Sequence, residues 1–364
     1  MQYKEYGRTG KKVSVIGFGG MRFRKEDYAK SFDKCAAVVR RASELGINYF
    51  DTAPHYCDDK SEDIMGVAFK DMPNPFYVST KSAVWNERTA DDVRRRLEKS
   101  LKRMGLEKVN FFHMWCILDM EQYKQVMAPG GPYEGALKAK EEGLIEHIVF
   151  STHTSGEDIE TIVNQGYFEG ITLGYNATNF AFRQKGIKAA YKKGLGVVTM
   201  NPLGGGIIPE NSEFYSFLKN DEKDTLVQAA LKFNASHKEI TVALSGMKTI
   251  EEVEENVKAG ERLGEMTDEK LRAMAKKLNE SLDSLCTGCQ YCKGCPKDIE
   301  IPKYMDAYNL HILNKKDKEI SGRLNNHWGI SKEGAAECIE CGKCEVQCTQ
   351  HLPIIERLKY IANL

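Results

Sequence analysis

The sequence predicts an α/β protein, with a (β/α)8 TIM barrel over residues 1–265 followed by a linker helix and a small α-helical domain over residues 266–364. Short apolar runs alternate with amphipathic helical patterns through the first segment, and eight such units favour a closed barrel over an open sheet. The runs are continuous, as in parallel strands buried on both faces. A doubly wound sheet is the alternative, but no Gly-x-Gly-x-x-Gly turn follows the first run.

The predicted strands are short and rich in apolar residues. In chain order they are Val13–Phe18, Asn48–Asp51, Phe76–Lys81, Val109–His113, His147–Ser151, Ile171–Tyr175, Gly196–Met200 and Thr241–Ser245. Amphipathic patterns such as Thr89–Met104 and Thr225–Ser236 predict the helices between them. Before the first strand, Tyr3–Gly7 is expected to form a hairpin with Lys12–Val15 that closes the bottom of the barrel.

Two helix signals follow the barrel. Thr267 is a typical N-cap residue, and Asp268 and Glu269 place negative charge in the first turn after it. Pro302 opens a second helical pattern further along the chain. These signals predict a linker helix and then a helix inside the C-terminal domain.

The charge composition excludes some classes of partner. Lys and Arg number 52, as do Asp and Glu, so the formal net charge is zero. This balance gives no electrostatic basis for binding nucleic acid or an anionic membrane. No apolar run approaches the roughly 20 residues that span a bilayer, and residues 1–20 show no signal-peptide pattern. We therefore expect a cytoplasmic protein in a reducing compartment.

Eight of the 11 cysteines form two tight runs in the C-terminal segment. The runs are Cys286-x2-Cys289-x2-Cys292-x2-Cys295-Pro296 and Cys338-x2-Cys341-x2-Cys344-x3-Cys348. They resemble the bacterial ferredoxin pattern that holds a pair of 4Fe–4S clusters. Structural zinc usually needs two Cys pairs a dozen or more residues apart, and disulfides suit a secreted chain. The unbroken spacing favours clusters over both alternatives.

The ferredoxin resemblance also implies how the ligands are shared. In two-cluster ferredoxins the fourth Cys of each run ligates the other cluster. One cluster is then held by Cys286, Cys289, Cys292 and Cys348, and the second by Cys338, Cys341, Cys344 and Cys295. The first run departs from the pattern by one residue before its last Cys, but one residue spans at most about 3.6 Å, so the crossed arrangement stays feasible.

Four polar residues fall at the ends of neighbouring predicted strands. Asp51 ends the second strand, Tyr56 lies in the loop after it, Lys81 ends the third strand and His113 the fourth. In a parallel barrel such residues meet at the C-terminal mouth. A Tyr is a useful acid when a nearby cation lowers its pKa from about 10, and a desolvated Lys can do so. An Asp would hold the Lys, and a His could hydrogen-bond a carbonyl oxygen.

These residues lie in motifs that resemble those of the aldo-keto reductase superfamily. The motifs are Gly7-Arg8-Thr9-Gly10, Asp51-Thr52-Ala53 with Tyr56, Ser79-Thr80-Lys81, Pro202-Leu203-Gly204-Gly205 and Glu255-Asn256. With the cysteine runs added, the chain is similar to the iron–sulfur branch of that superfamily. The resemblance implies an oxidoreductase that moves a hydride between NAD(P)H and a small-molecule carbonyl or alcohol. It assigns Tyr56 as general acid, Lys81 and Asp51 as the groups that tune it, and His113 as the residue that orients the carbonyl.

The same resemblance implies a nucleotide site. Its expected members are Ser151 and Asn176 near the nicotinamide, and Gly246, Lys248 and Asn256 near the adenosine phosphates. Thr152 and Thr172 stand where the family usually has amides, and Glu252 stands where it often has an Arg. Lys248 is available for a 2′-phosphate as a point charge. NADP and NAD both stay open.

Two functional hypotheses follow. In the first, the two clusters pass electrons to or from the barrel and to a ferredoxin-like or flavoprotein partner. A hydride carries two electrons and a cluster carries one, so direct coupling needs a flavin-like intermediary. In the second, the barrel is flavin-dependent or has lost its cofactor, and the cluster domain serves electron transfer to a partner or has a structural or docking role. The segment Ile207–Leu218 is expected to shape the substrate pocket.

Overall fold

The computed structural model describes residues 1–154, 156–177, 180–219, 221–278, 285–286, 291–292, 294–314, 317–328, 330–348 and 350–364. By contacts these residues fall into two compact units. The first comprises Met1–Asn176, Arg183–Pro202 and Leu218–Met266, and the second comprises Ala177–Phe182, Leu203–Phe217 and Thr267–Leu364. The division at residue 265 stays a prediction, because two loops of the barrel sequence group with the C-terminal residues.

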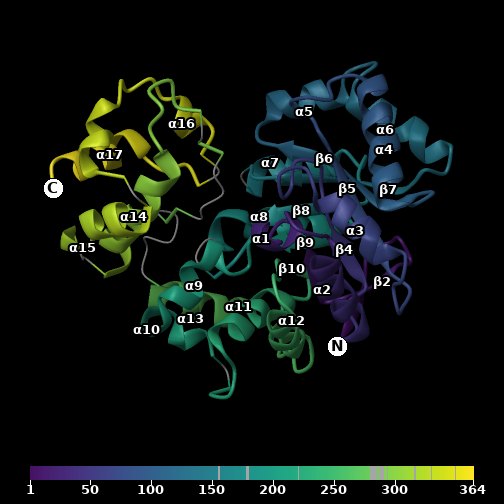
Figure 1. The fold of residues 1–364 in the computed structure, drawn as a ribbon, viewed down its shortest axis with the longest axis horizontal. Helices are drawn as coiled ribbons and strands as arrows, with labels where there is room; N and C mark the ends of the chain where they lie inside the picture. The colour runs from purple at the N-terminus through teal and green to yellow at the C-terminus, as the bar shows by residue number, and fades with distance from the viewer. Residues whose placement is uncertain are drawn as a thin grey trace. The chain divides into compact units, whose positions relative to one another are not determined.

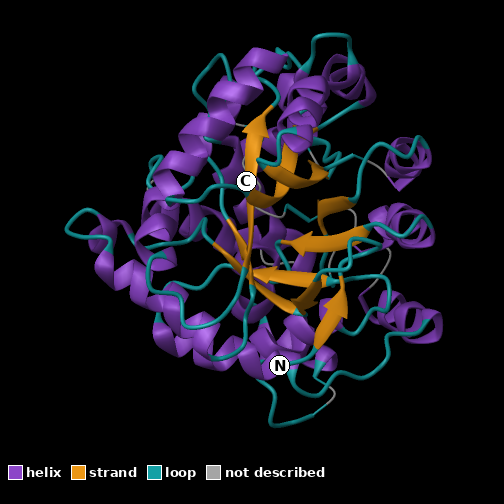
Figure 2. Cartoon of the chain, turned by 90° about the vertical axis from the view of Figure 1, so that its right-hand side faces the viewer, coloured by secondary structure: helices purple, strands orange, loops and turns teal. Residues whose placement is uncertain are grey.

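Eight parallel strands close into a barrel in the first unit, in the order β10-β3-β4-β5-β6-β7-β8-β9. They are β3 (Ile16–Gly19), β4 (Tyr49–Asp51), β5 (Tyr77–Ala83), β6 (Val109–Ile117), β7 (Ile145–Thr152), β8 (Gly170–Gly174), β9 (Gly196–Met200) and β10 (Val242–Ser245). Figure 2 shows these strands, in orange, with helices to their outside. Each predicted strand is present, so the predicted fold class is confirmed.

The helices of the barrel sequence follow the strands. They are α1 (Lys25–Tyr28), α2 (Asp33–Glu44), α3 (Ser61–Phe69), α4 (Ala90–Met104), α5 (Met120–Met127), α6 (Pro132–Glu141), α7 (Gly156–Asn164), α8 (Phe180–Lys192), α9 (Ile207–Glu210), α10 (Ser212–Tyr215), α11 (Leu226–Ala235) and α12 (Ile250–Asn256). Thr89 and Asp92 form a capping box at the start of α4, which satisfies backbone donors that the helix leaves free. Gly105 ends α4 in a left-handed conformation.

A small hairpin forms at the N-terminus, as predicted. Strands β1 (Tyr3–Glu5) and β2 (Lys12–Ser14) pair antiparallel. Tyr6 follows β1, is fully buried, and its ring centroid lies 4.1 Å from that of Phe111 in β6. Tyr6, Tyr49 and Phe111 belong to one apolar cluster inside the barrel. The hairpin therefore seals one end of the barrel and leaves the carboxyl ends of the strands for chemistry.

The second unit is helical. Besides α9 and α10, its helices within the described residues are α13 (Asp268–Leu278), α14 (Ile301–Asn314), α15 (Asp317–Gly322), α16 (Lys343–Val346) and α17 (Ile354–Ala362). Thr267 accepts a hydrogen bond from the backbone N–H of Lys270 at 3.2 Å, which confirms it as a cap. A buried core joins α14, α15 and α17 through Met305, Ile320 and Leu358 (Figure 1). Several cysteines lie in the same core, which places them among apolar side chains.

No helix in the described part of the chain is long and apolar enough to cross a membrane.

Candidate active site

A buried ion pair lies at the mouth of the barrel. Lys81 Nζ is 2.5 Å from Asp51 Oδ1 and donates to the carbonyl oxygen of Thr52 at 2.8 Å. The side chains of Lys81 and Asp51 are only 3% and 4% exposed. Burial lowers the pKa of Lys81, because it disfavours the charged form, while the Asp51 carboxylate opposes that change. The two residues end up together because β4 and β5 are paired in parallel register.

His113 completes a hydrogen-bonded chain with the same carboxylate. It lies beside Lys81 in the β5–β6 register and is fully buried. The hydroxyl of Ser79 donates to Asp51 at 2.8 Å and lies 3.1 Å from His113 Nδ1, while His113 Nε2 lies 2.8 Å from the hydroxyl of Thr172. Burial first, and then the charge of Lys81, hold the pKa of His113 well below its usual value.

This chain of hydrogen bonds fixes the tautomer of His113. The carboxylate of Asp51 only accepts, so the single hydroxyl proton of Ser79 is committed to it. Nδ1 of the neutral imidazole must then carry the proton and donate to Ser79, and Nε2 accepts from Thr172. To donate from Nε2 to a carbonyl oxygen, His113 has to change tautomer, with Ser79 turning its hydroxyl toward Nδ1.

Tyr56 lies in the loop after β4, above the Lys81 ammonium. Lys81 Nζ is 5.4 Å from the centroid of the Tyr56 ring. The Trp115 and Tyr56 rings pack edge to face, with their centroids 5.5 Å apart. His55 and Cys57, its two neighbours, both have positive φ angles, a strained conformation that is concentrated at functional sites. The loop conformation and these ring contacts together hold Tyr56 close to Lys81.

The pKa of Tyr56 differs from the sequence expectation. We expected Lys81 to lower it, but burial, and next the charge of Asp51, raise the pKa of Tyr56 well above its ordinary value. The physical reason is that burial disfavours the charged phenolate and that the Asp51 carboxylate, which lies 2.5 Å from Lys81, repels it. In this state Tyr56 is a protonated phenol that can only donate its proton as charge develops on a bound group.

The residues predicted for the nicotinamide end lie at the ends of β7 and β8. Ser151 is 1% exposed, and its hydroxyl has no hydrogen-bond partner among the residues that the structure describes. Asn176 is fully buried and donates from Nδ2 to the carbonyl oxygen of Asn201 at 3.0 Å. A buried hydroxyl without a partner is costly unless a ligand satisfies it. Ser151 therefore fits the carboxamide of a nicotinamide ring.

The residues predicted for the adenosine phosphates lie after β10. Asn256 donates from Nδ2 to the Ser245 hydroxyl at 3.0 Å, while its buried Oδ1 has no partner within the described residues. Lys248 is exposed, and its backbone N–H donates to the carboxylate of Glu252 at 2.6 Å. Gly246 is exposed at the end of β10. This region thus offers a backbone turn at a helix start, with one acidic and one basic side chain.

Sequence reasoning missed Ser79 and Thr172 as parts of the catalytic network. Thr172 was considered only for the nicotinamide, and its hydroxyl instead lies against His113. Ser79 lies two residues before Lys81 in β5, and side chains two apart share one face of a strand. That spacing was the available signal for Ser79.

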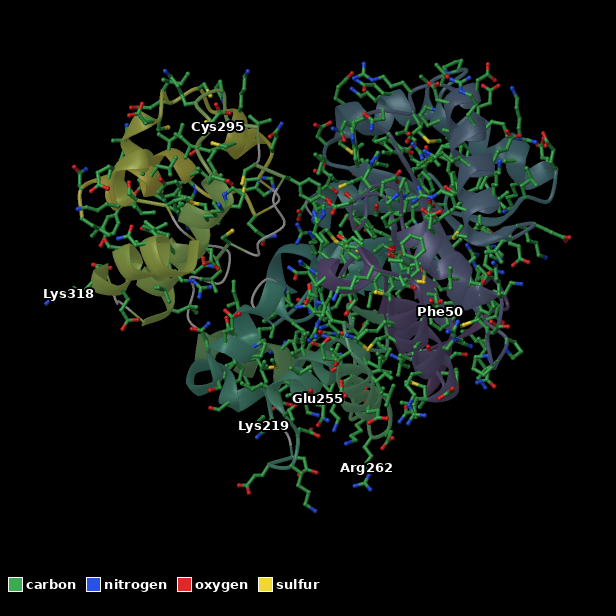
Figure 3. All side chains as sticks on the ribbon, viewed as in Figure 1. Phe50, Lys219, Glu255, Arg262, Cys295 and Lys318 are labelled. Carbon is green, nitrogen blue, oxygen red and sulfur yellow. The ribbon has the colours of Figure 1, made fainter. Side chains whose placement is uncertain are left out.

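The second cysteine run surrounds a hollow in the C-terminal unit. The hollow is lined by Cys338, Cys341 and Cys344, together with Cys292 and Cys295 of the first run. Figure 3 labels Cys295 among these side chains. In the described residues, no three His, Cys, Asp or Glu side chains form a group that fits a single metal ion. The cysteines border a hollow instead, as a multi-iron core requires.

Two other predicted ligands, Cys286 and Cys348, do not line that hollow. They are 8% and 7% exposed and belong to the apolar core of the unit. The charges of both cysteines oppose the lowering of the Arg357 pKa by burial. Cys289 falls outside the described residues.

A closed parallel barrel with a Tyr, a buried Lys–Asp pair and a His at its mouth defines an oxidoreductase of the aldo-keto reductase class. The Aldo/keto reductase family model matches residues 15–279, and that of a 4Fe-4S dicluster domain matches residues 285–353. The chain belongs to the Aldo/keto reductase family and carries a C-terminal 4Fe-4S domain, as the sequence resemblance predicted.

Individual relatives agree. The L-galactose dehydrogenase of Arabidopsis thaliana is 29% identical over 285 residues, which cover 71% of this chain and 88% of that protein. An aldo-keto reductase from Bacillus halodurans in its holo form has a TM-score of 0.64 at 19% identity, over 76% of this chain and 96% of the other. A Klebsiella pneumoniae aldo/keto reductase solved with NADP and acetate has a TM-score of 0.63 at 18% identity, over 76% and 95%. The two solved structures show the shared fold.

Proposed function

We propose that the barrel transfers a hydride between NAD(P)H and a small aldehyde or ketone, or catalyses the reverse oxidation of an alcohol. The observation that carries this proposal is the buried Lys81–Asp51 pair beside Tyr56 at one mouth of the barrel. Tyr56 is the general acid, whose hydroxyl gives its proton to the carbonyl oxygen as negative charge develops there. Lys81 stabilises the phenolate that remains, and Asp51 keeps Lys81 charged and oriented.

His113 orients the carbonyl in this proposal. For this role the neutral imidazole would carry its proton on Nε2 and donate it to the carbonyl oxygen, while Nδ1 accepts from the Ser79 hydroxyl. Its low pKa keeps it neutral near pH 7, so it does not compete with Tyr56 as an acid. The nearby rings of Trp115 and Trp85, 4.9 Å apart, give the substrate an apolar and aromatic wall.

The residues present fit a nicotinamide nucleotide. Bound nicotinamide nucleotide supplies or accepts the hydride. The unpartnered Ser151 hydroxyl suits the carboxamide, and the unpartnered Asn256 Oδ1 suits a donor of the adenosine. The Klebsiella aldo/keto reductase of the same fold was solved with NADP, which supports a nicotinamide nucleotide for this barrel. The charge of Lys248 favours a 2′-phosphate and that of Glu252 disfavours it, so these residues do not decide between NADPH and NADH. Calorimetric titration with each nucleotide under anaerobic conditions decides which one binds.

That titration also tests the alternative hypothesis. Heat with either nucleotide supports the hydride reaction, and Lys248→Gln should weaken NADPH more than NADH. The exposed Lys258 provides the matched control, because Lys258→Gln removes the same charge elsewhere. No heat with either nucleotide would favour a flavin-dependent or cofactor-free barrel, and mass measurement of the extracted cofactor separates those two.

We propose that the C-terminal unit holds two 4Fe–4S clusters with crossed ligands. Cys338, Cys341, Cys344 and Cys295 hold one core, and the hollow that these four residues line, with Cys292 of the other set at its border, supports their proximity. The other core is held by Cys286, Cys289, Cys292 and Cys348, and the shared influence of Cys286 and Cys348 on Arg357 supports their proximity. Iron and sulfide analysis should give about eight of each per chain. Finding zinc, or about four irons, contradicts this assignment.

The clusters then exchange electrons with a carrier protein of ferredoxin or flavoprotein type. Cys341 is exposed to solvent. Two large apolar residues near it in the sequence, Ile339 and Val346, are also exposed, by 55% and 84%. Exposed apolar side chains next to a redox centre are typical of a transient docking site. Val346→Glu should raise the half-saturating concentration of reduced ferredoxin but leave reduction by dithionite unchanged. Equal effects on both reductants would contradict this docking role.

A further inference from the structure

The C-terminal unit buries an arginine side chain that the electron-transfer proposal does not use. Arg357 lies in α17 and is 4% exposed. Its guanidinium carbon is 4.8 Å from the centroid of the Tyr308 ring in α14. No described carboxylate forms an ion pair with it, and its Nη1 has no hydrogen-bond partner among the described residues. A stacked ring satisfies one face of the guanidinium, but its N–H groups still need acceptors.

Two predicted cluster ligands, Cys286 and Cys348, belong to the core against which the Tyr308 ring packs, and Arg357 stacks on that ring. Burial lowers the pKa of Arg357, whereas the charges of Tyr308, then Cys286 and Cys348, and last Glu356 oppose that change. Both cysteines are held in place: Cys286 exchanges two 2.8 Å hydrogen bonds with the Asn309 side chain, and Cys348 Sγ accepts from the backbone N–H of Leu352 at 3.4 Å. The buried guanidinium therefore belongs to the same core region as two cysteines from different runs.

We propose that Arg357 is the buried counter-charge of the cluster held by Cys286, Cys289, Cys292 and Cys348, and that it makes this cluster easier to reduce. The inference rests on the proposed two-cluster assignment. Reduction adds one electron and hence one negative charge to the cluster and its thiolates. A fixed cation beside them stabilises the reduced form more than the oxidised form, and cluster potentials follow net charge and hydrogen bonds to sulfur. Arg357 is a positioning and tuning residue and does not ligate iron.

Lys359 provides a matched control on the same helix. Its ammonium is 2.8 Å from Glu340, and its side chain is 55% exposed, so solvent screens its charge. Lys359→Gln and Arg357→Gln both remove one positive charge from α17. Arg357→Lys keeps the charge but loses the planar stack on Tyr308. The three variants separate buried charge, overall charge and packing.

The experiment is an anaerobic redox titration of the full chain, followed by electron paramagnetic resonance, with iron counted in every sample. In Arg357→Gln one of the two clusters should shift at least tenfold in its reduction equilibrium toward the oxidised form, which is about 59 mV more negative for one electron. The other cluster, and both clusters in Lys359→Gln, should keep their potentials. Arg357→Lys should lie nearer to wild type than to Arg357→Gln.

Each result has a defined meaning. Unchanged potentials in Arg357→Gln with eight irons retained, or equal shifts in Arg357→Gln and Lys359→Gln, overturn the proposal. If Arg357→Gln keeps about four irons while Arg357→Lys keeps about eight, the cluster needs the charge to assemble, which supports it. If both substitutions of Arg357 lose one cluster, the residue acts by packing and the proposal is wrong. About four irons in the wild-type chain would instead reject the two-cluster assignment itself.

Discussion

Each of the two units buries one cation, and the units differ in what balances it. Lys81 in the barrel has Asp51 at 2.5 Å. Arg357 in the C-terminal unit is as deeply buried, but no described carboxylate is paired with it. Removing an ion from water is costly unless a counter-charge is close. The polypeptide alone therefore balances the cation at the barrel mouth, whereas in our proposal the negative charge of the clusters balances the cation of the C-terminal unit.

Of the predicted effects, removal of iron should cause the largest difference between the two units. The C-terminal unit should lose its cooperative unfolding transition, because cluster binding supplies free energy of folding, on the order of 10 kcal/mol as for structural zinc. The barrel should keep its own transition, since its buried charges are paired internally. Calorimetry of the chain before and after anaerobic chelation, with limited proteolysis to locate the unfolded unit, checks both statements. A single transition that iron removal leaves in place would contradict the difference.

In our proposal catalysis depends on the barrel mouth, so Tyr56→Phe should show the next largest effect. Loss of the general acid should lower kcat for carbonyl reduction by about 10²- to 10⁴-fold, while the iron content stays unchanged. Tyr167→Phe is the matched control. Tyr167 is 49% exposed, so this substitution removes the same hydroxyl from the protein surface. Steady-state kinetics on one accepted aldehyde measures both variants. Wild-type turnover in Tyr56→Phe would mean that another group supplies the proton.

Asp51→Asn tests whether the barrel cation needs its counter-charge. The substitution leaves Lys81 buried and unpaired, so the free energy of unfolding should fall by about 3–5 kcal/mol. The control is Glu254→Gln, which breaks an ion pair of Arg41 that is 2.8 Å long but half-exposed, and should cost less than about 1 kcal/mol. Urea denaturation of the two variants measures the difference. Similar losses in both would show that burial does not set the value of the Lys81–Asp51 pair.

The sequence predicted most of the fold and part of this site, for identifiable reasons. The apolar runs marked the strands, so Asp51, Lys81 and His113 were recognisable as residues of neighbouring strands. The predicted ends were too early for two strands, because β5 continues to Ala83 and β6 to Ile117. The predicted direction of the Tyr56 pKa was wrong, because burial of the phenol and then the nearby Asp51 carboxylate raise this pKa, and both depend on the folded structure. The role of Thr172 depends on a contact with His113 between β8 and β6, which are not adjacent strands.

The sequence therefore did not predict how charged and hydrogen-bonding side chains of different strands pair with one another. Cysteine spacing likewise predicted two ligand sets, but nothing in that spacing indicated an arginine buried beside one of them. Both gaps concern interactions between residues far apart in the sequence. Local sequence patterns indicate on which face of a strand or helix a residue lies. They do not indicate which distant residue it will contact.

The smallest predicted effect concerns pH and the neutral state of His113. Its pKa in the folded chain is well below 6.5, so as the pH falls below 6.5 the unfolded chain takes up a proton that the folded chain does not. Folding stability must then decrease toward acid, by up to about 1.4 kcal/mol per pH unit for this group. His113→Gln should remove that part of the slope, while His55→Gln, which changes an exposed histidine, should leave it unchanged. Urea unfolding of the three proteins between pH 4.5 and 7, in steps of about half a unit, measures the slopes. Parallel stability curves for wild type and His113→Gln would show that His113 takes up its proton in the folded state, and that the hydrogen-bonded chain from Asp51 to Thr172 does not keep it neutral.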